Sequence, residues 1–86
     1  MKPTMPRVFK VGNGLFERLV HGLGMDAAIS RTMLSEALAS VGSSPIEATR
    51  ADVERSLPVI ERRLRALLAD RLAAQRIRKL HEMLHA

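Results

Sequence analysis

The chain has 86 residues, a formal net charge of +5, and no cysteine, tryptophan or tyrosine. This length fits one domain with a small core, and the lack of cysteine excludes disulfides and thiolate metal sites. Leucine, valine, isoleucine, methionine and alanine must supply the core, and small domains of this kind often gain burial by forming oligomers. We therefore expect a single domain that forms a homodimer.

The chain opens with a basic segment, residues 1–12, which contains two prolines and which we expect to be a flexible N-terminal arm. Residues 13–86 are expected to form a single helical domain. The opening segment lacks the long apolar run of a signal peptide or a membrane span, so we expect no membrane association. The absence of cysteine fits a cytoplasmic location.

Capping residues and apolar periodicity predict two helices in the first half of the chain. Asn13 can cap the first helix, and Gly22 and Gly24 end it. Asp26 can cap the second, which is expected over residues 27–41. The apolar faces expected to be buried comprise Leu15, Phe16, Leu19, Val20 and Leu23 in the first helix, and Ile29, Met33, Ala37, Leu38 and Val41 in the second.

A single turn and a further helix are expected next. Ser44-Pro45-Ile46-Glu47 has the pattern of a capping box, and we expect Ile46 to enter the core at that corner. Thr49 can cap the following helix, because its hydroxyl can accept a hydrogen bond from a backbone N–H of the first turn. Asp52 lies three residues later, where a carboxylate is favoured by the positive end of the helix.

Pro58 interrupts the stretch that follows Thr49, because proline lacks a backbone N–H and disfavours helical geometry in the residue before it. Two interpretations follow: Pro58 begins a new helix, or it kinks a continuous one. We favour the new helix, with a corner at Ser56-Leu57. The apolar stripe of the helix after Pro58 comprises Ile60, Leu64, Leu67 and Leu68.

The last stretch, residues 59–86, contains no glycine or proline, so one long helix is possible. At about 100° per residue, a second apolar stripe lies roughly opposite the first and comprises Ala69, Ala73, Ile77, Leu80 and Leu84. A break at Ala69-Asp70, with Asp70 as the N-cap of the last helix, would turn both stripes toward one core as a helical hairpin, which we favour over an unbroken helix that bridges two subunits. In either arrangement, we expect a second copy to cover part of this stripe, so the expected oligomer interface comprises Ile77, Leu80 and Leu84.

No stretch alternates between apolar and polar residues for long enough to predict a strand. The elements therefore predict an all-α fold. We expect a compact bundle of four to five short helices, with a C-terminal helical hairpin or long helix.

The sequence His81-Glu82-Met83-Leu84-His85 matches the H-E-x-x-H pattern of zinc hydrolases, in which two histidines one helical turn apart bind the metal. The pattern lies in the last six residues, and no ligand follows it. We therefore predict no catalytic residues, no metal and no cofactor, and we do not expect an enzyme. His81 and His85 remain weak candidates for adventitious metal binding.

Arginine makes up most of the fourteen basic residues of the chain, which favours an acidic protein, nucleic acid or an anionic surface as a partner. The stretch from Arg55 to Lys79 contains no aromatic residue that could stack on a base, and an ordinary solvated face would have the same composition. We favour solvated or protein-facing arginines over nucleic acid. The candidate residues for binding nucleic acid or an acidic partner are Arg55, Arg62, Arg65, Arg71, Arg76, Arg78 and Lys79.

The run Thr49, Asp52, Val53, Leu57, Pro58, Ile60, Glu61, Leu64 and Arg65 follows the pattern T-x-x-D-V/L, then L-P-x-I/L-E-x-x-L-R. Over residues 15–68 the chain resembles small helical interaction or output modules of bacterial signal-transduction proteins. The resemblance implies a non-catalytic regulatory module that binds another protein, of a signalling system. The alternative is a small basic nucleic-acid-binding protein, nucleoid-associated or transcription-regulating, that uses the arginine-rich C-terminal helices.

Overall fold

The computed structural model describes residues 12–85, and this part of the chain forms four helices and no strand. The helices are α1 (Gly14–Gly22), α2 (Ala27–Ala39), α3 (Arg50–Leu67) and α4 (Asp70–Leu84). The predicted all-α fold is confirmed. The predicted N-terminal arm lies outside the described residues except for Gly12. None of the four helices is long and apolar enough to cross a membrane.

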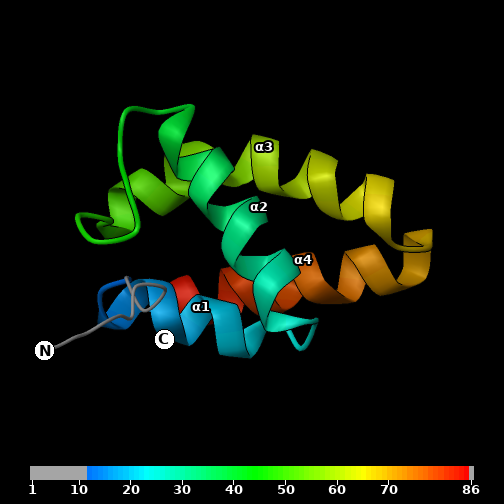
Figure 1. The fold of residues 1–86 in the computed structure, drawn as a ribbon. Coiled ribbons are helices and arrows are strands. Elements are labelled where there is room, and N and C mark those ends of the chain that lie inside the picture. Colours follow the sequence, from blue (N-terminus) through cyan, green and yellow to red (C-terminus); the bar gives the residue numbers. More distant parts are fainter. Residues whose placement is uncertain (1–11, 86) are drawn as a thin grey trace, which may run out of the picture.

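The four helices form a closed ring, because α1 packs on α2 and α4, and α3 packs on the same two helices. Figure 1 shows α3 and α4 running in opposite directions, with α2 lying diagonally across α3. Every helix contributes to one apolar core. The side chains that are almost completely buried include Phe16, Leu19, Leu23, Leu34, Leu38, Ile60, Leu64, Leu80 and Leu84.

Asn13 fixes the start of α1 and ties it to the loop between α2 and α3. Its side-chain oxygen accepts a hydrogen bond from the Phe16 N–H at 2.9 Å, which is the predicted N-cap. Its side-chain amide donates to the Ala48 carbonyl at 2.8 Å, and its backbone N–H donates to the Pro45 carbonyl at 2.9 Å. The loop before α3 is therefore held by hydrogen bonds to the first helix.

The expectation that Ile46 enters the core at this loop is wrong. Ile46 is 65% exposed, whereas its neighbour Ala48 is buried. Asn13 binds the loop through backbone carbonyls, which leaves the Ile46 side chain directed away from the core.

The favoured break at Pro58 is also wrong, because α3 continues through it from Arg50 to Leu67. Proline removes one hydrogen bond from the interior of a helix. Here the carbonyl that loses its partner belongs to Glu54, and both Glu54 and Pro58 are exposed, so water can take the place of the missing donor. Leu57 and Ile60 flank the proline and are both buried on the same side of α3, which holds the helix together.

The predicted hairpin is confirmed: α3 ends at Leu67 and α4 begins at Asp70. The N-cap of α4 is Ala69, which makes no side-chain cap, and not Asp70 as expected. The hairpin carries Ile77, Leu80 and Leu84 into the core of a single chain. These three residues, expected to form an oligomer interface, are instead covered by the chain's own helices and offer no free surface to a second copy.

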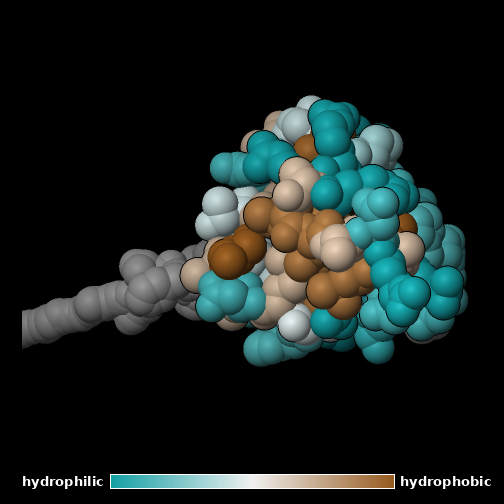
Figure 2. All heavy atoms as spheres, turned by 90° about the vertical axis from the view of Figure 1, so that its right-hand side faces the viewer, coloured by the Kyte–Doolittle hydropathy of each residue, from teal (hydrophilic) through white to brown (hydrophobic). Residues whose placement is uncertain are grey.

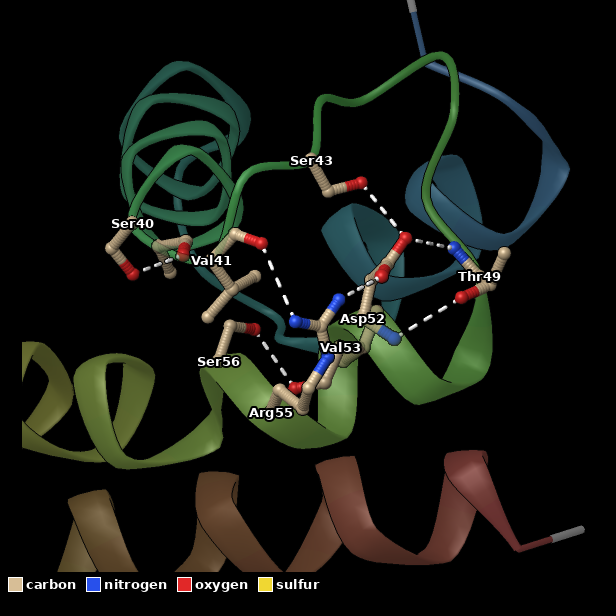
Figure 3. A network of polar contacts seen from close by, with 9 residues as sticks. Ser40, Val41, Ser43, Thr49, Asp52, Val53, Arg55 and Ser56 are labelled. Carbon is tan, nitrogen blue, oxygen red and sulfur yellow. Dashed lines mark hydrogen bonds and ion pairs between the residues drawn. The ribbon is translucent and has the colours of Figure 1, made fainter.

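The first turn of α3 is held by a polar network around Asp52 (Figure 3). Thr49 and Asp52 form a reciprocal capping box, because each side chain accepts a hydrogen bond from the other residue's backbone N–H. Asp52 also accepts a hydrogen bond from the Ser43 hydroxyl at 2.9 Å and pairs with Arg55. These donors, led by Ser43, lower the pKa of Asp52 from 3.8 to about 2.

We expect Leu64→Ala to lower the free energy of unfolding by about 2–5 kcal/mol, because Leu64 is fully buried and truncation leaves a cavity. The matched control is Leu67→Ala on the same helix, which should change it by no more than about 0.5 kcal/mol, because Leu67 is half exposed. Urea unfolding followed by circular dichroism measures both. Equal effects of the two substitutions would show that the described orientation of α3 is wrong.

We expect the protein to lose stability as the pH falls from 3.8 toward 2. The pKa of Asp52 is lower in the folded chain than its ordinary value, so the ionised carboxylate stabilises the fold above pH 3.8 and this contribution disappears on protonation. Asp52→Asn should flatten the profile in this window. Thermal unfolding at a series of pH values provides the measurement, with Glu54→Gln as a control for loss of a carboxylate elsewhere on α3. If Asp52→Asn lost as much stability as the wild type between pH 3.8 and 2, the contribution assigned to the Asp52 carboxylate would be contradicted.

Candidate functional site

Two large apolar side chains that were predicted to lie in the core are exposed and line the same groove on the surface. Ile29 of α2 is 48% exposed and Leu67 of α3 is 54% exposed. They border a groove of about 500 Å³ between the two helices, which we call the α2–α3 groove. Its lining residues are Ala28, Ile29, Thr32, Met33, Glu36, Arg63, Ala66 and Leu67.

The groove follows from the angle between the two helices. In Figure 1, α2 runs diagonally across α3, and its first turns lie toward the end of the molecule at which α3 meets α4. Figure 2 looks onto that end and shows apolar atoms gathered in its centre, surrounded by hydrophilic side chains. Contiguous exposed apolar surface rimmed by polar residues is typical of interaction sites.

The rotation of α2 about its own axis exposes Ile29. The helix buries Ser30 and Leu34 together with the predicted Met33, Ala37 and Leu38, so the buried face is displaced from the one that the sequence predicted. The Arg31 guanidinium holds this rotation, since it makes two hydrogen bonds of 2.6 Å to the Glu17 carboxylate of α1. The pair lowers the pKa of Glu17 and raises that of Arg31.

This rotation places the apolar side chain of Ile29 at the surface and the polar side chain of Ser30 in the core. The Ser30 hydroxyl is fully buried and has no hydrogen-bond partner among residues 12–85. A buried hydroxyl without a partner destabilises a fold, as does an exposed isoleucine relative to a buried one. Conflicts of this kind between local sequence and structure are expected at functional sites. Sequence periodicity missed the site because it assigned Ile29 and Leu67 to the core.

An ion pair joins the two walls of the groove. The Arg63 guanidinium of α3 lies 2.6 Å from the Glu36 carboxylate of α2, and both side chains are about half exposed. Such a pair contributes only about 0–1 kcal/mol. Since Arg63 and Glu36 neutralise each other, the lining residues of the groove carry no net charge.

The structure separates the seven predicted binding cations into different environments. Arg55 is paired with Asp52. Arg76 is partly buried, with its guanidinium against Gly24, and its buried Nε has no hydrogen-bond partner in the part of the chain that the structure describes. The other five are exposed and form no ion pair in the described part of the chain: Arg62, Arg65, Arg71, Arg78 and Lys79.

Of the two histidines of the H-E-x-x-H sequence, His81 lies in the last turn of α4 and His85 is its C-cap. Their rings stack with centroids 6.4 Å apart, and His81 Nε2 lies 3.5 Å from Glu61 Oε2 of α3. Across the described residues, no group of three or more histidine, cysteine, aspartate or glutamate side chains is placed to hold a metal ion. The observed partner of His81 gives it a role in joining α4 to α3.

Comparisons with protein-family models, with curated proteins and with solved structures found no match for this chain. A function is therefore inferred from the geometry of the chain itself.

We expect Ser30→Ala to raise the free energy of unfolding by up to about 1 kcal/mol, because it removes a buried hydroxyl that has no partner among the described residues. The matched control is Ser56→Ala. Ser56 is also fully buried, but its hydroxyl donates to the Val53 carbonyl at 2.8 Å, so its removal should lower stability by about 0.5–1.5 kcal/mol. Urea unfolding compares the two variants. Destabilisation by Ser30→Ala would contradict the described rotation of α2.

Proposed function

We propose that this protein is a non-catalytic regulatory module that binds another protein, of a bacterial signalling system, through the α2–α3 groove. The observation that carries the proposal is the exposure of Ile29 and Leu67 beside a concave surface. A partner side chain placed there would remove apolar surface from water on both molecules, which is the main favourable term in association. The signalling context is supported by the resemblance of residues 15–68 to output modules.

The proposal includes a cytoplasmic location, which the lack of cysteine favours. Homodimerisation stays a prediction. Because Ile77, Leu80 and Leu84 are covered within one chain, a dimer would have to use a different surface from the one expected.

Nucleic-acid binding is the alternative function, and the exposed cations Arg62, Arg65, Arg71, Arg78 and Lys79 are the observation in its favour. Phosphate contacts need such side chains. They do not need an apolar groove, and Phe16, the aromatic residue of the described part, is buried and cannot stack on a base. Protein binding therefore explains more of the observed surface.

We expect the double substitution Ile29→Ser and Leu67→Ser to weaken partner binding strongly without unfolding the protein, because both side chains are exposed. Tagged wild-type protein and this groove variant would each retain proteins from a bacterial lysate, which mass spectrometry identifies. One protein retained only by the wild type is then purified and titrated. Its dissociation constant should rise by about tenfold or more in the groove variant, as for an interface hot spot.

The control for this experiment is Ile46→Ser, which removes a still more exposed apolar side chain outside the groove and should bind like the wild type. Titration with duplex DNA at two salt concentrations tests the alternative. Tight DNA binding that collapses as salt rises, with the groove variant unaffected, would reject the protein-binding proposal.

A further inference from the structure

We propose that in the free protein the α2–α3 groove is covered by Val8 and Phe9 of the same chain, so that a partner must displace them to bind. This inference rests on the proposed function and adds the regulation of the same surface. Both residues lie outside the described part of the chain. Three observations on the described residues lead to it: where the chain enters the fold, what lies between that point and the groove, and the chemistry of the groove.

The described chain enters the fold beside α2. Gly12 lies directly against α1, because a Cβ atom at this position would collide with the Phe16 ring and would lie 2.9 Å from Glu17 Oε2. The Glu17 carboxylate in turn accepts two hydrogen bonds of 2.6 Å from the Arg31 guanidinium of α2. The residues that precede Gly12 therefore join the fold next to the side of α2 that faces α1.

The solvent side of α2 separates this entry point from the groove, and its side chains are short. At about 100° per residue, Ser35, Ala28 and Thr32 follow Arg31 around the helix in the direction of the groove. Ala28 and Thr32 are exposed and line the groove, and Ser35 is partly exposed. A segment that crosses α2 here would pass over these short side chains and reach the groove from its α2 wall.

The width of α2 matches the position of two apolar residues in the sequence. An α-helix with its side chains is about 10–12 Å across. Val8 and Phe9 lie four and three residues before Gly12, and an extended chain of that length spans about 10–14 Å. The two side chains are thus at the distance from Gly12 that crossing α2 requires.

The chemistry of the groove suits these side chains. Ile29 and Leu67 border it, and its volume is about 500 Å³. A phenylalanine side chain can bury about 150–250 Å² of surface, so Phe9 could cover a large part of the exposed apolar lining. The Glu36–Arg63 pair leaves that lining without net charge, and the basic residues near Phe9 are therefore not repelled.

Attachment favours the same chain over a second copy as the occupant. A short connection holds a ligand at an effective concentration of about millimolar, and only Lys10 and Val11 lie between Phe9 and Gly12. A second copy would have to be present at that concentration to compete. The conformational entropy lost on ordering the connecting residues is comparable in size with the gain from burying Val8 and Phe9. Occupancy by the chain itself is therefore weak enough for a partner to displace.

The test measures how fast a thiol in the groove reacts, which is possible because the chain has no cysteine of its own. Ala66→Cys places a thiol in the groove lining. The matched control is Ala74→Cys, the same substitution at an exposed position of α4 outside the groove. Each is made in the wild-type chain and in an N-terminal variant that carries Val8→Ser and Phe9→Ser. The rate of reaction with an aromatic disulfide reagent is followed by absorbance.

We expect the Ala66→Cys thiol to react about threefold faster or more in the N-terminal variant, as for a groove that is covered at least about two-thirds of the time. The Ala74→Cys thiol should react equally fast in both chains. A synthetic peptide with the sequence of residues 1–11, added to the N-terminal variant at about millimolar concentration, should slow the Ala66→Cys thiol again. The same peptide with serine at positions 8 and 9 should leave the rate unchanged.

Equal rates for Ala66→Cys in the two chains, an equal rise at both thiols, or a peptide without effect would overturn the inference. Protection that disappears on dilution identifies a second copy as the occupant and overturns it as well. The proposed function is decided by a separate measurement, which is partner binding to the groove variant. Weakened partner binding together with equal thiol rates rejects only the covered groove, whereas full partner binding rejects the proposed function whatever the thiol rates.

Discussion

The burial of Ile60 and Leu64 is the interaction on which the rest of the structure depends. Both side chains are fully buried on α3, the longest helix, and α3 packs on α2 on one side and on α4 on the other. Each such side chain stabilises the fold by about 1.5–3 kcal/mol relative to an exposed position. This gain is comparable with the loss of about 3 kcal/mol associated with a proline inside a helix, which explains why α3 continues through Pro58.

Closure of the ring imposes a second constraint, which acts on α2. This helix must pack on α1 and α3 at once, and the two hydrogen bonds from Arg31 to Glu17 hold it against α1. In that orientation Ser30 points inward and Ile29 outward. The core is completed without the largest apolar side chain of the first turn of α2, and the same rotation supplies one border of the groove. The binding surface and the packing of the core are thus consequences of one orientation.

Local signals in the sequence predicted the helices well. Asn13, Asp26 and Thr49 cap the helices that they were expected to cap, and the opposed stripes of the last two helices predicted the hairpin. These features depend on residues close in sequence, for which capping chemistry and periodicity are sufficient.

The candidate site could not be predicted in the same way. Periodicity shows that a helix has an apolar side, but it does not decide which of several apolar residues at the edge of that side is covered by a neighbour. Ile29 and Leu67 lie at such edges, and their exposure depends on the rotation of α2 and on its angle to α3. The prediction that Ile46 enters the core failed for a related reason, because hydrogen bonds from Asn13 to its loop decide where the Ile46 side chain points.

The walls of the groove are held independently of any ligand, which bears on how it would bind. The α2 wall is anchored to α1 by Arg31, the α3 wall is anchored by its buried stripe, and the Glu36–Arg63 pair joins them. A preformed site loses little conformational freedom on binding, so more of the gain from apolar burial remains as affinity.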